Sequence, residues 1–238
     1  MGREAGLAKM PIDHAIEERL MIVRARIGAA AYKAKRDPAS IRLVLATKTQ
    51  PCDTIRAAWD AGARDFGENY VQEAIAKRAE LADLADIRWH LIGHLQTNKA
   101  KTAASAFALI HSVDSVRLAE ALARAQPSTR VHALIEVNLG AEASKSGVAP
   151  DGVAAILDAA RGKIEIDGLM TIPPPAASAE AARPYFVRMR ELRDRLAIQS
   201  GYALSELSMG MTDDFEVAIE EGATIVRIGR AVFGERIK

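Results

Sequence analysis

The stretch IRLVLATKTQPCDTIRAAWDAG, residues 41–62, contains a strand pattern followed directly by a helix pattern. Its apolar run from Ile41 to Thr47 is short and bounded by polar residues, which is typical of a strand buried on both faces. Pro51 favours the first turn of a helix, and Gly62 favours its end. One strand and one helix in succession form the repeating unit of an α/β fold. The predicted inner face of this helix is Ile55, Ala58 and Trp59.

The same alternation continues to residue 234 without a break in composition. Strict alternation requires parallel strands joined by crossovers, and eight such units in one domain indicate a closed barrel. We therefore predict a single domain over residues 1–238, an α/β fold of the (β/α)8 TIM barrel type, with an open doubly wound sheet as the alternative. Residues 1–10 are expected to be irregular, and residues 12–35 to form an extra N-terminal amphipathic helix. Further strands are expected at 65–67, 88–92, 108–112, 131–137, 164–170, 206–208 and 224–228. Helices are expected at 70–84, from about 98, at 115–125, after 150, from the proline-rich loop at 173–175 to about 200, and at 213–222. A short helical turn is expected at 229–234.

The composition is that of an ordinary globular protein, with 49% apolar and 26% charged residues. A net charge of +1 without a long basic run argues against nucleic-acid binding. The single cysteine, Cys52, excludes a disulfide framework and a cysteine-based zinc site, and fits a reducing cytosol. The N-terminus does not have the pattern of a signal peptide, and no apolar run approaches the roughly 20 residues of a membrane span. We expect a cytoplasmic protein that does not bind membranes.

Lys48 directly follows the first strand, and the functional residues of this fold lie where strands end. An ammonium at the mouth of an apolar barrel is partly desolvated, which would lower the pKa of the amine and favour Schiff-base chemistry. A lysine that extends from the strand end into solvent is the alternative.

Two turns, SMGMT at 208–212 and GRAVFG at 229–234, follow the seventh and eighth strands. In this fold these turns form the recurrent phosphate site, although ordinary glycine turns are the alternative. Asp213 and Glu216 are expected to form a capping box on the helix after the first turn. The candidate phosphate donors are the hydroxyls of Ser208 and Thr212 and the backbone N–H groups of Gly210, Gly229 and Arg230.

Arg227 lies inside the eighth strand, between Val226 and Ile228. Its guanidinium stays charged, so that burial requires an acceptor. A cofactor ring nitrogen and a structural carboxylate are the two candidates. Two histidines, His90 and His94, are four residues apart, but one falls in a strand and the other in a loop, which argues against a metal site.

Several segments together resemble the pyridoxal phosphate homeostasis protein family. They are KT at 48–49, FGENYVQE at 66–73, WHLIGHLQTNK at 89–99, SKSG at 144–147, GLM at 168–170, SMGM at 208–211 and RIG at 227–229. The resemblance runs from about residue 40 to 236. It implies a barrel like the N-terminal domain of alanine racemase, with pyridoxal 5'-phosphate held as a Schiff base on Lys48.

The same resemblance implies further cofactor-binding positions. It places Asn69 and Met170 near the cofactor and Arg227 against its pyridine nitrogen. It assigns the phosphate to the two turns named above. Glu142 and Lys145 match positions implicated in cofactor exchange, and by chemistry alone they form an exposed ion pair.

Two positions depart from the family pattern. Gln50 stands where relatives often carry a second lysine, which puts cofactor transfer through this position in doubt. Arg230 stands where a threonine often follows the last strand, and it either adds a cation beside the phosphate or contributes only its N–H.

The resemblance implies vitamin B6 homeostasis or carriage rather than enzymatic turnover. A ring nitrogen that faces Arg227 stays unprotonated, which makes the ring a poorer electron sink. Alanine racemase needs a second acid–base group from another domain, and we expect no such domain after the barrel in this chain. A weak amino-acid racemase, and a barrel that binds another phosphorylated metabolite, are the alternatives. The sequence leaves open which apo-enzymes receive the cofactor and whether the protein is a monomer or a weak homodimer.

Overall fold

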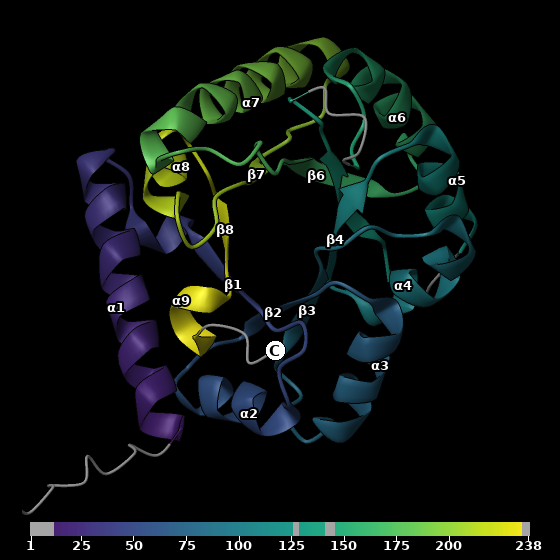
Figure 1. Ribbon diagram of the computed structural model, residues 1–238. Coiled ribbons are helices and arrows are strands. Elements are labelled where there is room, and N and C mark those ends of the chain that lie inside the picture. Colours follow the sequence, from purple (N-terminus) through teal and green to yellow (C-terminus); the bar gives the residue numbers. More distant parts are fainter. Residues whose placement is uncertain (1–11, 126–128, 141–145, 235–238) are drawn as a thin grey trace, which may run out of the picture.

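The computed structural model describes residues 12–125, 129–140 and 146–234 of the chain. Eight parallel strands pair in sequence order, and the last pairs with the first, so that the sheet closes into a barrel. Figure 1 shows this barrel end-on, with helices in a ring around it. The closed barrel confirms the predicted fold class over the open sheet. The strands are β1 (Arg42–Ala46), β2 (Asp65–Glu68), β3 (Arg88–Leu91), β4 (Leu109–Val113), β5 (His132–Glu136), β6 (Glu165–Met170), β7 (Glu206–Ser208) and β8 (Ile225–Ile228).

Helices connect and cover these strands on the outside of the barrel. They are α1 (Ile12–Lys33), α2 (Cys52–Asp60), α3 (Val71–Glu80), α4 (Ala100–Ala106), α5 (Val116–Arg124), α6 (Val153–Ala160), α7 (Ala179–Ser200), α8 (Phe215–Glu220) and α9 (Arg230–Phe233), with 3₁₀ turns at η1 (Pro38–Ser40), η2 (Thr97–Lys99) and η3 (Pro150–Gly152). No helix in the described part of the chain combines the length and the apolar character needed to cross a membrane.

The apolar core has two layers, because successive residues of a strand point to opposite faces of the sheet. On β1, Leu45 packs into the large layer between barrel and helices, whereas Val44 points into the barrel. The interior layer is a small cluster of Val44, Leu109, Leu134, Met170 and Ile225. Buried polar side chains, among them Ser208 and Arg227, also lie in the barrel, and the candidate site begins there.

Helix α1 packs against α2, α8 and α9, on the left of Figure 1. Its buried stripe is Ile16, Leu20, Val23 and Ile27, as the helical spacing predicts. This helix therefore covers the barrel of its own chain.

The start of α8 differs from the prediction. The N-terminal cap is Asp214, whose Oδ1 accepts from the backbone N–H of Met211 at 2.7 Å. Glu216 instead makes a two-bond ion pair with Arg26 of α1, both bonds at 2.9 Å, and Asp213 pairs with Arg230. The capping box expected from Asp213 and Glu216 is wrong, because arginines distant in the sequence bind both carboxylates.

The helix expected at 70–84 is also shorter, since α3 ends at Glu80. Leu81 and Leu84 reach the core from a turn instead, in which Leu84 N donates to Leu81 O at 3.0 Å.

Gly168 allows β6 and β7 to approach closely. A Cβ atom at this position would lie 1.8 Å from the carbonyl oxygen of Glu206. We expect Gly168→Ala to lower the free energy of unfolding by about 1–3 kcal/mol through overpacking, measured by urea denaturation. The control is Gly28→Ala on α1, where the new Cβ meets no atom within 4 Å and a gain of about 0.5–1 kcal/mol is expected from helix propensity. Equal stability of the two variants would contradict the close approach of β6 and β7.

Candidate functional site

Lys48 is half-buried and lies two residues after the end of β1, at the C-terminal end of the barrel. The chain turns here, and Gln50 N donates to Thr47 O at 2.9 Å. Thr49 has a φ of 64°, in the left-handed region that is unfavourable for a β-branched residue. A strained turn persists only where its surroundings hold it in place.

An ion cluster of two buried residues, Glu68 and Lys77, and the half-buried Glu73 holds this turn, and we call the three residues the turn clamp. The ammonium of Lys77 donates to Thr47 O at 2.8 Å and to Oε1 of Glu68 and of Glu73, both at 2.7 Å. The same Glu73 oxygen accepts from Thr49 N at 2.8 Å. These hydrogen bonds therefore hold the backbone at Thr47 and at Thr49, on both sides of Lys48.

Glu68 is the most buried member of the turn clamp, with 0% of its surface exposed. Its Oε1 also accepts from Thr47 Oγ1 at 2.6 Å, whereas its Oε2 has no hydrogen-bond partner in the described structure. Burial raises the pKa of Glu68, against the hydrogen bonds from Lys77 and Thr47. Sequence reasoning did not find this clamp, because Glu73 and Lys77, four apart on a helix, have the spacing of an ordinary surface ion pair.

Arg227 is buried inside the barrel on β8, the strand next to β1. Its Nη1 donates to Ser208 Oγ at 2.6 Å and its Nη2 to Thr171 O at 3.0 Å. Burial lowers the pKa of Arg227 to about 10, while the charges of Glu136 and Asp214 raise it. No carboxylate of the described residues is hydrogen-bonded to this guanidinium, so its acceptors are neutral.

Ser208 ends β7 and is fully buried. Besides the contact with Arg227, its Oγ lies 2.9 Å from His111 Nδ1. His111 Nε2 lies 3.0 Å from His90 Nδ1, and His90 Nε2 lies 2.9 Å from Asp65 Oδ1. A line of polar side chains therefore crosses the barrel interior.

The burial of His90 and His111 predicts that the folded protein loses stability in acid. Burial lowers the pKa of His90 and lowers that of His111 still further. The unfolded chain then binds protons that the folded chain excludes, so stability present at neutral pH is lost as the pH falls below about 6.5. Urea denaturation at a series of pH values should show this decline.

Asp65 predicts a second decline of the free energy of unfolding, at lower pH. Although burial opposes its ionisation, hydrogen bonds from Arg88 and His90 hold the pKa of Asp65 well below its usual range. A folded pKa below the unfolded one adds stability that is lost below about pH 4. For His90 and His111, the contradicting result is an unfolding free energy that stays constant between about pH 7 and pH 5, because buried neutral histidines would lower it.

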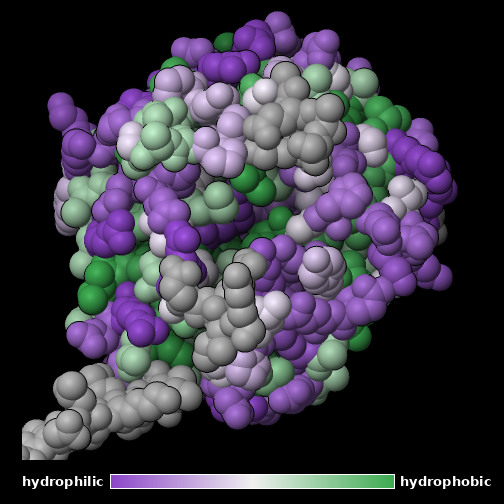
Figure 2. Space-filling model, in the orientation of Figure 1, coloured by the Kyte–Doolittle hydropathy of each residue, from purple (hydrophilic) through white to green (hydrophobic). Residues whose placement is uncertain are grey.

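The two turns expected to bind phosphate lie side by side, since Thr212 Oγ1 accepts from Ala231 N of α9 at 3.4 Å. Gly210 has a φ of 93°, and a Cβ there would lie 2.6 Å from Ala218 Cβ. Gly229 caps α9, and a Cβ there would lie 3.2 Å from Ala46 O of β1. Both turns are therefore narrow backbone structures that glycine makes possible. In Figure 1, α9 lies to one side of the barrel opening, near β1. Figure 2 shows that the surface is hollowed at the centre of this end.

The other predicted positions lie at or near the same end of the barrel. Asn69 follows β2 and is half-buried, and Met170 ends β6 in the interior cluster. The side chain of Arg230 is exposed and pairs with Asp213. Parallel strands place all of these at one end, together with Lys48. Glu142 and Lys145 lie outside the described residues.

Sequence reasoning missed one further charged group at this end. Glu136 ends β5, is buried, and accepts from Ser146 Oγ at 2.6 Å. Burial raises its pKa. A carboxylate inside the apolar run ALIEV, residues 133–137, was the available signal.

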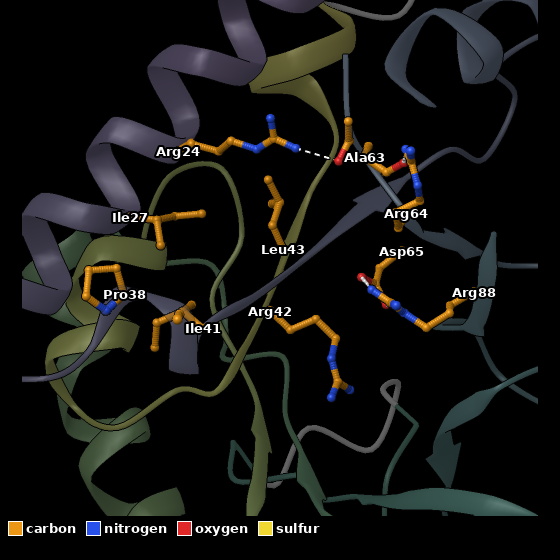
Figure 3. A pocket seen from close by; sticks show the side chains of 12 residues that line it. Arg24, Ile27, Pro38, Ile41, Arg42, Leu43, Ala63, Arg64, Asp65 and Arg88 are labelled. Atoms are coloured by element: carbon orange, nitrogen blue, oxygen red, sulfur yellow. Dashed lines mark hydrogen bonds and ion pairs between the residues drawn. The ribbon is translucent and has the colours of Figure 1, made fainter. Parts of the chain in front are cut away.

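The opposite end of the barrel holds a cavity of about 580 Å³. It lies where β1, β2 and β3 begin, and Figure 3 shows Arg42, Asp65 and Arg88 on its wall. Arg24 there donates to the carbonyls of Ala61 and Gly62, and Arg88 forms a bidentate pair with Asp65. These charges serve structural contacts, so we place the candidate site at the C-terminal end, despite the size of this cavity.

His90 lies in β3 and His94 in the loop after it, as predicted. His94 is exposed and pairs with Asp114 at 3.1 Å. Within residues 12–125, 129–140 and 146–234, no three His, Cys, Asp or Glu side chains are grouped to hold a metal ion.

A parallel barrel with a lysine after β1, a buried arginine on β8 and two glycine turns defines a class of protein. The family model described as "Alanine racemase, N-terminal domain" matches residues 24–237. An alanine racemase from Corynebacterium glutamicum has this fold, with a TM-score of 0.71 at 16% identity over 94% of this chain and 62% of that one.

More similar proteins narrow the class. A pyridoxal phosphate homeostasis protein of Pseudomonas aeruginosa is 45% identical over 93% of this chain and 96% of its own length. One of Aquifex aeolicus is 45% identical over 92% and 97%. The solved structure of PipY from Synechococcus elongatus with PLP bound has a TM-score of 0.82 at 40% identity, over 92% of this chain and all of PipY. This chain belongs to the pyridoxal phosphate homeostasis protein family, which confirms the resemblance found in the sequence.

Proposed function

We propose that this protein binds pyridoxal 5'-phosphate as a Schiff base on Lys48 and acts in vitamin B6 homeostasis as a carrier. The observation that carries the proposal is the pairing of a clamped lysine after β1 with a buried arginine on the adjacent strand β8. The relatives' names and the PLP-bound PipY structure support the same ligand.

The residues of this end fit such a ligand. Lys48 offers a primary amine on a turn that the clamp holds. Arg227 is a buried cation with neutral acceptors, and it can donate to the pyridine nitrogen. The two glycine turns with Thr212 offer backbone and hydroxyl donors to the phosphate, and Asn69 and Met170 complete the surroundings.

In this proposal Ser208 has a different role from the one predicted from the sequence. Its fully buried hydroxyl contacts His111 and Arg227, so we assign this side chain to Arg227 rather than to the phosphate. Gly210, Gly229 and Arg230 remain the proposed phosphate donors through their N–H groups.

A carrier requires binding without efficient turnover. When bound, the cofactor supplies an aldehyde for attachment and a ring that withdraws electrons. Arg227 would keep the ring nitrogen unprotonated and thus weaken that electron sink. The relatives are named as homeostasis proteins. We propose transfer of the cofactor to apo-enzymes as the role.

The test is covalent trapping. The purified protein is incubated with the cofactor, reduced with borohydride and digested, and the peptides are identified by mass spectrometry. The mass of one reduced pyridoxyl phosphate is expected on the peptide that contains Lys48. Protein that remains colourless and unmodified would favour the alternative, binding of another phosphorylated metabolite.

A weak amino-acid racemase is the second candidate, because the fold is that of alanine racemase. Incubation of the loaded protein with L-alanine and L-serine, followed by chiral chromatography, separates the two. Rapid formation of the D-isomers would overturn the carrier role while leaving cofactor binding intact.

A further inference from the structure

The polar line across the barrel interior runs from the N-terminal end to Arg227. It consists of Asp65 on β2, His90 on β3, His111 on β4 and Ser208 on β7. Each of these four residues has at most 6% of its surface exposed. Their hydrogen bonds are between 2.6 and 3.0 Å, including the last one to Arg227.

The chemistry of the end groups sets the direction of every bond. The Asp65 carboxylate only accepts, so His90 must donate from Nε2. A neutral His90 then accepts at Nδ1, and His111 must donate to it from Nε2. The Nδ1 of neutral His111 accepts in turn, so the Ser208 hydroxyl donates to His111. Its oxygen is then available to accept from Arg227, which can only donate.

Both ends of the line are fixed from outside it. At one end, Arg88 holds Asp65 with bonds of 2.8 and 2.6 Å. At the other, Thr171 O accepts from the second nitrogen of Arg227. One orientation of the protons satisfies all these groups, because reversal would leave a bare Nε2 of neutral His90 facing the Asp65 carboxylate, which can only accept.

We propose that Asp65, His90, His111 and Ser208 are positioning residues for Arg227, which they hold by a one-directional hydrogen-bond chain. This inference rests on the proposed function, in which Arg227 faces the ligand. Neutral serine and carbonyl acceptors orient the guanidinium without neutralising its charge. Two of its five N–H groups make these bonds, and others are left for an acceptor on the ligand.

The chain itself is tested by nitrogen NMR of the protein labelled at histidine, without added ligand. Both His90 and His111 are expected to be neutral at neutral pH, with the proton on Nε2 and a bare Nδ1. A proton on Nδ1 of either ring, or a charged imidazole, would overturn the proposal whether or not the protein binds pyridoxal phosphate.

The effect on Arg227 is tested with Ser208→Ala and a matched control. Ser112→Ala also removes a buried serine hydroxyl from the barrel wall, but this one donates to Gly93 O at 2.6 Å, outside the chain. Ser208→Ala is expected to weaken pyridoxal phosphate binding by about tenfold, the loss of one hydrogen bond to a charged group. Ser112→Ala should bind like the wild type, and Ser208→Thr should restore binding.

The same variants separate the possible outcomes. In Ser208→Ala the His111 Nδ1 signal should shift, while Ser112→Ala leaves it in place. Wild-type affinity in Ser208→Ala, or an equal loss in both alanine variants, would overturn the positioning role. A wild-type protein that does not bind pyridoxal phosphate would refute the proposed function instead, and the NMR result would stand.

Discussion

Lys48→Ala is expected to abolish covalent attachment of pyridoxal phosphate to the protein. A Schiff base requires a primary amine, and in this proposal Lys48 supplies it. After incubation with the cofactor and borohydride, intact-mass spectrometry should show one added group on the wild type and none on the variant. Non-covalent binding through Arg227 and the two glycine turns should persist, at least tenfold weaker.

Lys48→Arg is the matched variant for this prediction. It retains the positive charge at the end of β1 but cannot form an imine. We expect no covalent adduct with this variant either. That result would show that attachment requires the primary amine and not only the positive charge. A stoichiometric adduct on either variant would show that another lysine carries the cofactor.

Lys77→Met is expected to lower the free energy of unfolding by about 3–5 kcal/mol, the cost of leaving one partner of a buried ion pair alone. Glu68 is fully buried and would lose the ammonium at 2.7 Å. Thr47 O and Glu73 would lose the same donor. Urea denaturation measures the effect, and the release of the turn should also slow attachment of the cofactor at Lys48.

The penalty of Lys77→Met should depend on pH. Burial already raises the pKa of Glu68, and removal of the cation would raise it further. A folded pKa above the unfolded one means that the folded state binds more protons, so the variant regains stability as the pH falls. The difference from the wild type should be smaller at about pH 5 than at about pH 8.

The double variant Lys77→Met, Glu68→Gln serves as the control. It removes the buried charge together with its partner, so its stability should exceed that of Lys77→Met alone. A penalty for Lys77→Met below about 1 kcal/mol would place this pair in the range of exposed ion pairs and contradict its burial.

The order of strands and helices could be predicted from residues 41–228 because hydrophobic periodicity is local. Each apolar run, such as residues 41–47, carries the period of its own element. The strands end where polar residues begin, which is why Lys48 and the turns near 210 and 229 were identified as candidates. The resemblance to relatives then added Asn69 and Met170, which no local pattern indicates.

The partners of charged side chains could not be predicted in the same way. Asp213 and Glu216 have the spacing of a capping box, yet Arg230 and Arg26 bind them. Lys77 has the spacing of a surface lysine and lies buried under the turn after β1.

The sequence by itself determined the barrel, the end at which its candidate site lies and the lysine that follows β1. Each of these depends on residues close together in the chain. Only the tertiary structure decided which acceptors hold Arg227 and which cation supports the turn at Lys48. Closure of the sheet brings Asp65, His90, His111 and Ser208 together from four strands spread over 144 positions. A buried charge takes its partner from whichever strand or helix lies nearest in space, and spacing along the chain does not contain that information.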